Sequence, residues 1–306
     1  FTSFTAPPTN YRFDCRAGTL EPVGATGTFD SSSYETKQVW YTSKDGTKVS
    51  MFVVHKKGLA LDGARPTILN GYGGFNIAET PFFNALLFPW FEDGGVFALP
   101  NLRGGGEYGD QWHEAGMLER KQNTFDDFAA AAGWLKASGY ADPARIAIRG
   151  GSNGGLLVGA MLTQHPGLFR AALCKYPLLD MVRYHRFRIA RLWVPEYGSA
   201  EDPAQFAVLH AYSPYHRVVP GTDYPAVLLA TGDADTRVDP LHARKMTALL
   251  QAATGSERPV LLHYSLKAGH SQGRSVRSEV EDYAVDLHFL FWQLGIEAPW
   301  KAKGGR

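Results

Sequence analysis

The most restrictive feature of the sequence is a glycine-rich pentapeptide that joins an apolar run to a helical segment. Residues 150–154 read Gly-Gly-Ser-Asn-Gly and lie between the apolar residues 146–148 and 156–161. A strand that turns directly into a helix at Gly-x-Ser-x-Gly forms a nucleophile elbow, because glycines lack the Cβ that would clash in so sharp a turn. The turn lifts the serine hydroxyl clear of the sheet. Ser152 is therefore the candidate nucleophile, and the alternative is an incidental serine in a glycine-rich loop.

A serine hydroxyl attacks only when a base takes its proton, and the base needs an acid to orient it. After a nucleophile elbow the acid precedes the histidine in the chain. The apolar run 226–230 is the next one that ends in a suitable loop, and three carboxylates compete there, Asp233, Asp235 and Asp239. We expect Asp235 to be the acid, because it lies at the crest of the loop. Asp233 is expected to bond its own turn, and Asp239 to cap the helix that follows.

The base must come from the four histidines that follow Asp235 in the sequence. His242 and His288 fall in helical segments, and His263 falls in a strand-like run. His270 instead lies in a loop between the last expected strand and the last expected helix, where an imidazole can reach both a serine and an acid. We therefore expect His270 to be the base.

Composition limits the class of protein. The chain of 306 residues is 44% hydrophobic and 20% charged, which is typical of a globular protein with one large core. A net charge of +1 gives no electrostatic reason to expect nucleic acid or an acidic membrane as a partner. Cys15 and Cys174 are too few for a disulfide framework, and no apolar run approaches the roughly 18 residues that span a bilayer. A serine mechanism also needs no metal or organic cofactor.

The order of the apolar runs predicts an α/β chain with the α/β-hydrolase fold. Two alternating segments, 36–41 and 49–55, flank an Asp-Gly pair and predict a hairpin. From Pro66 onward short apolar runs alternate with helical stretches, which is typical of a mostly parallel central sheet with helices on both faces. Strands are expected at 67–69, 96–99, 146–148, 171–176, 226–230 and 260–266, and helical segments at 126–137, 241–252 and 280–294.

Four motifs, in this order, resemble those of the catalytic domain of the prolyl oligopeptidase (prolyl endopeptidase) family of serine peptidases. They lie at residues 71–76, 101–109, 150–155 and 267–270. The resemblance covers essentially the whole chain. It implies a serine endopeptidase that hydrolyses oligopeptides on the carboxyl side of proline through an acyl-enzyme, without a cofactor.

The resemblance also implies how the oxyanion is held. The backbone N–H of Asn153 and the hydroxyl of Tyr72 match the two donors of the family. A phenol is a good donor to a developing negative charge. The alternative for Tyr72 is an aromatic side chain that only packs in its glycine loop.

Substrate contacts are implied in the same way. Trp193 matches the tryptophan on which the family stacks the proline ring, although taken alone it would be interpreted as a core or interface residue. Arg237 resembles the arginine that binds a substrate carbonyl, with an ion pair to Asp233 or Asp239 as its alternative. The remaining wall of the pocket is expected to consist of Phe75, Leu178, Ile189, Tyr197 and Val238.

Some expectations concern residues outside this pocket and other functions. Arg103 and Glu107 are expected to pair with each other and brace their loop. Glu196 is the only acid near Trp193, whereas a pocket for Lys or Arg would be lined with carboxylates. The alternatives to a prolyl oligopeptidase are an acylaminoacyl peptidase or a carboxylesterase of the same fold, and a non-catalytic hydrolase-like scaffold for protein interaction.

The two ends of the chain differ in what they resemble. Residues 1–23 resemble the end of a β-propeller with its linker, and residues 24–306 resemble the hydrolase domain. The propeller of the family is largely absent from this sequence, so we expect it as a partner segment of the same protein, beside a proline-containing peptide. We expect a cytoplasmic location. A periplasmic one is the alternative, because any signal peptide would lie upstream of Phe1.

Overall fold

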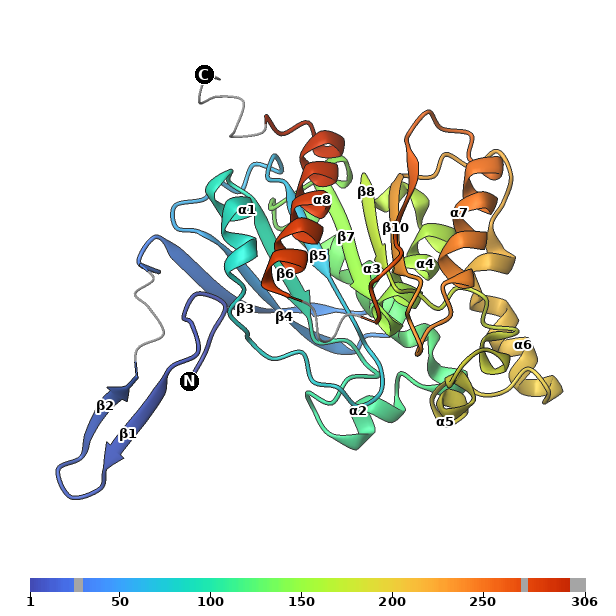
Figure 1. Cartoon of the computed structure of the whole chain (residues 1–306). Helices are drawn as coiled ribbons and strands as arrows, with labels where there is room; N and C mark the ends of the chain where they lie inside the picture. Colours follow the sequence, from blue (N-terminus) through green and yellow to red (C-terminus); the bar gives the residue numbers. More distant parts are fainter. Residues whose placement is uncertain (25–29, 271–274, 298–306) are drawn as a thin grey trace.

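The computed structural model describes residues 1–24, 30–270 and 275–297, and one eight-stranded sheet dominates it (Figure 1). Its strands are β3 (Tyr34–Thr42), β4 (Lys48–Lys56), β5 (Thr67–Asn70), β6 (Val96–Pro100), β7 (Ile146–Gly151), β8 (Ala171–Lys175), β9 (Ala226–Gly232) and β10 (Val260–Ser265). They lie in the order β10-β9-β8-β7-β5-β6-β4-β3. Neighbours from β10 through β6 are parallel, and β4 and β3 continue the sheet antiparallel. The predicted mostly parallel sheet is confirmed.

The predicted hairpin is the pair β3 and β4. The two strands pair from Tyr34 opposite Lys56 to Thr42 opposite Lys48. In the turn between them, the Ser43 N–H donates to the Thr47 carbonyl at 2.8 Å. Gly46 has φ +89°, which a residue with a side chain rarely adopts, so the Asp-Gly sequence is what allows this turn.

Helices cover both faces of the sheet (Figure 1). Alternate residues of one strand enter two separate cores: Ile146 and Ile148 enter one, and Ala147 enters the other. The core of Ile146 includes residues of α3 (Gln122–Ala137), α4 (Asn153–Gln164) and α7 (Leu241–Ala253). The core of Ala147 includes residues of α1 (Phe88–Glu92) and α8 (Val276–Leu294).

Within the described residues, no helix is both long and apolar enough to cross a membrane.

Two helices begin earlier in the chain than predicted. The helix expected from residue 126 begins at Gln122, and its first turn includes Thr124, which is buried and donates its hydroxyl to the Arg103 carbonyl at 2.8 Å. The segment expected from residue 280 begins at Val276, where the Ser275 hydroxyl caps the helix by accepting from the Ser278 N–H.

Three further helices extend the molecule at one end (Figure 1). They are short, and they lie in the segments between the strands. They are α2 (Asp110–Glu114), α5 (Val194–Tyr197) and α6 (Pro203–Tyr212).

The first residues of the chain contact the sheet, although the hairpin that follows projects away from it (Figure 1). Phe4 is buried, and its ring lies 5.5 Å from that of Phe52 and 6.1 Å from that of Phe97. The hairpin pairs β1 (Asn10–Asp14) with β2 (Thr19–Val23), and every residue in both strands is exposed. The aromatic contacts of Phe4 thus join the start of the chain to the eight-stranded sheet.

The topology brings four loops to one edge of the sheet. The loops after β5, β7, β9 and β10 all leave from the carboxyl ends of parallel strands, where ligands bind in open α/β sheets. These loops carry Tyr72, Ser152, Asp235 and His270. The fold therefore gathers the candidate catalytic residues from distant parts of the sequence.

Candidate active site

Ser152 lies in a strained turn between β7 and α4. Its backbone has φ 58° and ψ −117°, a conformation that a non-glycine residue rarely adopts. A Cβ on Gly150 would lie 2.2 Å from the Gly154 carbonyl oxygen, and a Cβ on Gly154 would lie 2.4 Å from the Gly71 carbonyl oxygen. Both outer positions of the pentapeptide therefore require glycine, as a nucleophile elbow does.

The structure brings Ser152, His270 and Asp235 together. His270 Nε2 lies 3.1 Å from Ser152 Oγ, and His270 Nδ1 lies 2.7 Å from Asp235 Oδ2. The side chain of Asp235 is fully buried. A carboxylate accepts the Nδ1–H, which leaves Nε2 as the acceptor for the serine proton. This geometry can deprotonate Ser152 as it attacks a carbonyl.

Asp235 also holds its own loop. Its Oδ1 accepts the backbone N–H groups of Arg237 and Val238, each at 2.9 Å. We expected Asp233 to bond its own turn, and this is wrong, because the Asp233 carboxylate accepts the hydroxyl of Tyr264 from the adjacent strand β10. The acid of the site is therefore also the residue that makes the turn.

Asp239 and His242 lie where the sequence predicts. The Asp239 carboxylate accepts the Leu241 N–H at 3.0 Å and so caps the start of α7. His242 is buried in that helix, and its Nδ1 accepts the N–H groups of Leu179 and Asp180. Burial lowers the pKa of His242 to about 4, so this imidazole is neutral and structural at neutral pH.

Tyr72 lies beside the nucleophile with its phenol protonated. Burial raises the pKa of Tyr72 to about 12, and the charges of Glu79 and Glu196 act in the same direction. Arg237 and a hydrogen bond with Ser152 oppose this shift in pKa. A phenol with this pKa can donate to a developing oxyanion throughout the neutral range.

Asn153 contributes to the site through both its backbone and its side chain. It is the first residue of α4, so its N–H is one of those that a helix leaves without an intrahelical acceptor. Its amide Nδ2 donates to the Tyr72 carbonyl at 2.6 Å, and its Oδ1 accepts the Tyr197 hydroxyl at 2.8 Å. Asn153 thereby fixes the Tyr72 loop against the elbow.

A buried ion cluster that the sequence did not predict supports the same loop. Glu196 Oε1 accepts the Phe75 N–H at 2.9 Å, while Oε2 lies 2.7 Å from His113 Nε2. Lys121 Nζ donates to the Gly73 carbonyl at 2.7 Å. Burial lowers the pKa of Lys121 to about 8, and the charge of Glu196 opposes this. From the sequence, Glu196 is interpreted only as the one acid near Trp193, whereas in the structure it supports the oxyanion loop through its bond to the Phe75 N–H.

Three aromatic residues expected in the substrate pocket lie in contact. The Phe75 ring is edge-on to Trp193 at 6.4 Å and to Tyr197 at 5.5 Å between centroids. Trp193 is half-buried, and Tyr197 is fully buried. Phe75 has φ 57°, so the glycine loop holds its ring in this position at some cost in backbone strain.

The three aliphatic residues expected in the pocket differ in how far they are buried. Leu178 and Val238 are buried within the core, and neither lines the cavity beside Ser152. Ile189 is 40% exposed at the surface. The structure thus gathers the aromatic part of the expected pocket more closely than the aliphatic part.

Arg237 faces a cavity of about 730 Å³ that Ser152, Tyr72 and His270 also line. The alternative expectation, an ion pair of Arg237 with Asp233 or Asp239, is wrong for the part of the chain that the structure describes. The Asp239 carboxylate pairs with Arg188 at 3.2 Å, and Asp233 is engaged by Tyr264. Arg237 therefore has its donors available to the cavity.

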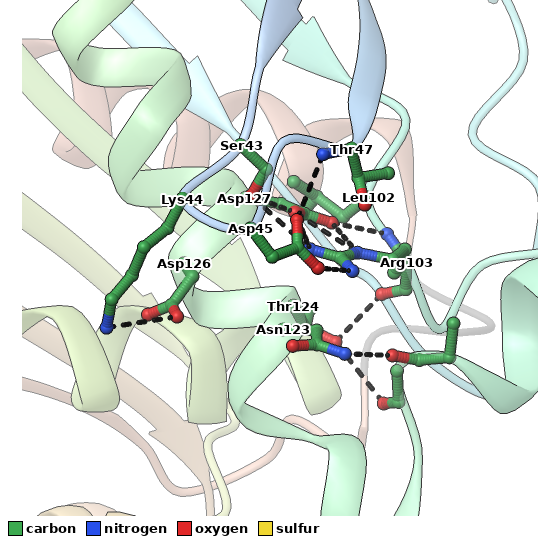
Figure 2. A network of polar contacts seen from close by, with 12 residues as sticks. Ser43, Lys44, Asp45, Thr47, Leu102, Arg103, Asn123, Thr124, Asp126 and Asp127 are labelled. Atoms are coloured by element: carbon green, nitrogen blue, oxygen red, sulfur yellow. Dashed lines mark hydrogen bonds and ion pairs between the residues drawn. The ribbon is translucent and has the colours of Figure 1, made fainter.

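Arg103 does not pair with Glu107, contrary to expectation. Figure 2 shows Arg103 between the β3–β4 turn and α3, where its guanidinium lies 2.7 Å from Asp127 and also pairs with Asp45. The buried Asp127 carboxylate in turn accepts the Ser43 hydroxyl. Arg103 thus ties the loop after β6 to the hairpin.

Glu107 has partners other than Arg103. It accepts the Glu79 N–H at 2.8 Å and the Asn101 side-chain amide at 3.3 Å. Burial raises the pKa of both carboxyl groups, and that of Glu79 reaches about 7 with a contribution from Glu107. Among the described residues, no three His, Cys, Asp or Glu side chains are grouped to hold a metal ion.

Comparison with known proteins agrees with this geometry. The prolyl oligopeptidase family model matches residues 81–297. A prolyl endopeptidase of Elizabethkingia miricola is 44% identical over 97% of this chain, and the match covers 42% of that protein. A prolyl endopeptidase of Dictyostelium discoideum is 39% identical over 97% of this chain and 40% of its own.

Solved structures give the same result. A chain from a structural and mechanistic study of two prolyl endopeptidases superposes with a TM-score of 0.93 at 50% identity, over 97% of this chain and 44% of that one. Prolyl oligopeptidase B from Galerina marginata, bound to a 35mer hydrolysis and macrocyclization substrate, gives a TM-score of 0.92 at 37% identity, over 97% of this chain and 43% of that one. This chain spans less than half the length of the relatives that it matches. The fold is that of an α/β-hydrolase, and the chain belongs to the prolyl oligopeptidase family.

Proposed function

We propose that this chain carries the catalytic site of a serine endopeptidase that hydrolyses oligopeptides on the carboxyl side of proline. The observation that carries this proposal is the continuous hydrogen-bonded series from Ser152 through His270 to Asp235, at 3.1 and 2.7 Å, in a nucleophile elbow. The aromatic group of Phe75, Trp193 and Tyr197 beside that elbow supports proline as the recognised residue. The prolyl endopeptidases among its relatives support the same assignment.

The first half of the reaction forms the acyl-enzyme. His270 Nε2 takes the Ser152 proton while Oγ attacks the carbonyl carbon of the substrate proline. The tetrahedral oxyanion accepts hydrogen bonds from the Asn153 N–H and the Tyr72 hydroxyl. The carbon–nitrogen bond then breaks, and the proton on Nε2 passes to the departing amine. Proline is left as an ester on Ser152.

The second half returns the free enzyme. A water molecule attacks the ester carbonyl and gives one proton to His270 Nε2. The same two donors hold the second oxyanion. When the ester bond breaks, the proton on Nε2 returns to Ser152 Oγ, and the proline carboxylic acid is released and loses its proton to water. The Asp235 carboxylate stabilises the imidazolium that exists in each half.

Specificity follows from the shape of the aromatic group. A flat indole offers its face to a flat, apolar pyrrolidine ring that has no N–H to satisfy, so the match rests on shape and dispersion. Arg237, which lines the cavity with Ser152, can donate to the carbonyl of the residue before proline. These contacts would hold the proline carbonyl against Ser152.

The proposal is tested by labelling with a fluorophosphonate and by hydrolysis of a Gly-Pro amide substrate. An activated serine reacts with the label, so we expect labelling and hydrolysis by the native chain and neither by Ser152→Ala. Ser138 lies at the end of α3, where its hydroxyl donates to the Trp134 carbonyl, and it does not line the cavity, so Ser138→Ala is the matched control that should retain both. Labelling that survives in Ser152→Ala would place the nucleophile at another serine.

A further inference from the structure

A second group of charged residues lines the cavity beside Ser152, on the face of the sheet opposite the aromatic group. Arg149 precedes Ser152 on β7, and its alternation with Ala147 places it on the face covered by α8. Phe75 and Trp193 pack against the core on the other face. Arg149 lines the same cavity as Ser152 and His270. A peptide held at Ser152 with its proline on the aromatic face therefore has a neighbouring segment near Arg149.

Arg149 is held in place without a carboxylate. Its guanidinium lies 5.0 Å from the centroid of the Tyr283 ring, and its Nη2 donates to the Tyr283 hydroxyl at 3.0 Å. No carboxylate of the described residues comes within ion-pair distance of it. Arginine has five N–H donors, so most of its donors remain for a ligand. The ring of Tyr283 fixes the guanidinium and leaves its charge uncompensated by a direct partner.

Arg149 is half-buried, and the buried cations of the described residues contrast with it. Arg103 lies 2.7 Å from Asp127, and Lys175 lies 2.6 Å from Asp286. Lys121 lies 3.9 Å from Glu196. The charges of Asp286 and Glu79 act on the Arg149 guanidinium from beyond ion-pair distance. At the cavity wall its donors have no carboxylate partner among the described residues, so a carboxylate of a ligand can pair with it there.

We propose that Arg149 is a specificity-determining residue that binds a carboxylate of the peptide substrate. This inference rests on the proposed function. A planar guanidinium and a carboxylate match geometrically as a bidentate pair. The carboxylate has two possible sources, an acidic residue immediately before proline or a carboxylate in the leaving peptide. Glu79, Glu279 and Asp282 also line the cavity and oppose an anion there, so the preference depends on the closer contact that Arg149 makes.

The test measures binding separately from turnover. Four peptides are titrated by calorimetry into the Ser152→Ala chain: acetyl-Gln-Pro-Ala-Ala amide as the neutral parent, its Gln-to-Glu form, its form with Glu after proline, and its free-acid form. We expect one carboxylate position to tighten binding by about tenfold or more, as charge-assisted hydrogen bonds do. The position that gains identifies the source of the carboxylate.

Variants then assign the gain to Arg149. Arg149→Met in the same background should abolish the tenfold gain and leave binding of the neutral peptide unchanged. Arg244→Met is the matched control, because Arg244 also lies over a tyrosine, Tyr264 at 5.9 Å, but outside the cavity. Glu79→Gln removes a carboxylate that opposes an anion in the cavity, so it should enlarge the gain in affinity for the charged peptide.

Three results would overturn the inference. The first is equal affinity for all four peptides, and the second is a preference for a charged peptide that survives Arg149→Met. The third is an equal loss of binding affinity for every peptide in that variant. The proposed function is judged by a different readout, which is hydrolysis of the neutral parent by the native chain. Binding that depends on Arg149 without hydrolysis would reject the proposed function and leave only the contact between Arg149 and a peptide carboxylate established.

Discussion

Asp235 binds the imidazole of His270 with one carboxylate oxygen and its own loop with the other. The Oδ2–Nδ1 distance is 2.7 Å, and Oδ1 accepts two backbone N–H groups at 2.9 Å each. Because the carboxylate is buried and bonded on both sides, it has little freedom to rotate. The position of His270 opposite Ser152 is therefore fixed by the conformation of the loop after β9.

Asp235→Asn should lower kcat by three to four orders of magnitude with little loss of stability. The amide oxygen can still accept the backbone N–H groups, but its NH₂ would face Nδ1 and favour the wrong tautomer of His270. Steady-state kinetics on a Gly-Pro substrate measure the loss. Asp233→Asn is the control, since its carboxylate bonds Tyr264 at the surface. Comparable losses in both variants would contradict the assignment of the acid.

Tyr72→Phe should lower kcat by about 100-fold, which corresponds to about 3 kcal/mol for one oxyanion donor. KM should change little, because the bond strengthens only in the transition state. With a pKa of about 12, the phenol keeps its proton, so no alkaline loss of activity from this group is expected below about pH 11. Tyr108→Phe removes a hydroxyl that bonds Ser50, outside the site, and should have almost no effect. A Tyr72→Phe variant with native kcat would exclude the hydroxyl from the oxyanion hole.

Local sequence patterns predicted much of this structure. The elbow at Ser152 and the Asp-Gly turn before β4 were predictable, because glycines are required by backbone geometry within a few residues. The loop position of His270 was predictable for a similar reason, since it lies between two strongly patterned elements. Where a few neighbouring residues determine the structure, the sequence carries enough information.

Side-chain partners across the fold were harder to predict. Arg103 was assigned to its near neighbour Glu107, but its ion pairs join it to Asp127 and Asp45, which are 24 and 58 positions away. The bond from Phe75 to Glu196 joins residues 121 positions apart. No short pattern encodes such pairs, because they depend on which loops the topology brings together.

Trp193→Ala should reduce kcat/KM on a Pro substrate by about 10- to 100-fold more than on the matched Ala substrate. The indole contributes surface that only the pyrrolidine ring uses, and pocket contacts of this size are worth about 1 to 3 kcal/mol. The ratio of the two specificity constants is the measurement. Trp292→Ala, at a tryptophan that is 63% exposed on α8, serves as the control. Equal losses on both substrates would make Trp193 a structural residue.

Stability should fall between pH 5 and pH 8 because of Glu79. Burial raises its pKa in the folded chain from 4.5 to about 7, so the folded state holds a proton that the unfolded state has lost in this range. From pH 5 to pH 8 the free energy of unfolding of the native chain should fall by on the order of 1 to 2 kcal/mol more than that of Glu79→Gln. Urea unfolding at both pH values measures the difference. Glu281→Gln, at an exposed residue paired with Arg277, is the control, and parallel pH profiles for all three chains would contradict the burial of Glu79.

The most direct test of the account is to map the bonds that this chain cleaves in a mixture of synthetic peptides of known sequence, by mass spectrometry of the products. The account predicts cleavage on the carboxyl side of proline, in products that are absent when Ser152→Ala replaces the native chain. Cleavage after residues other than proline, or post-proline cleavage that persists in Ser152→Ala, would contradict it.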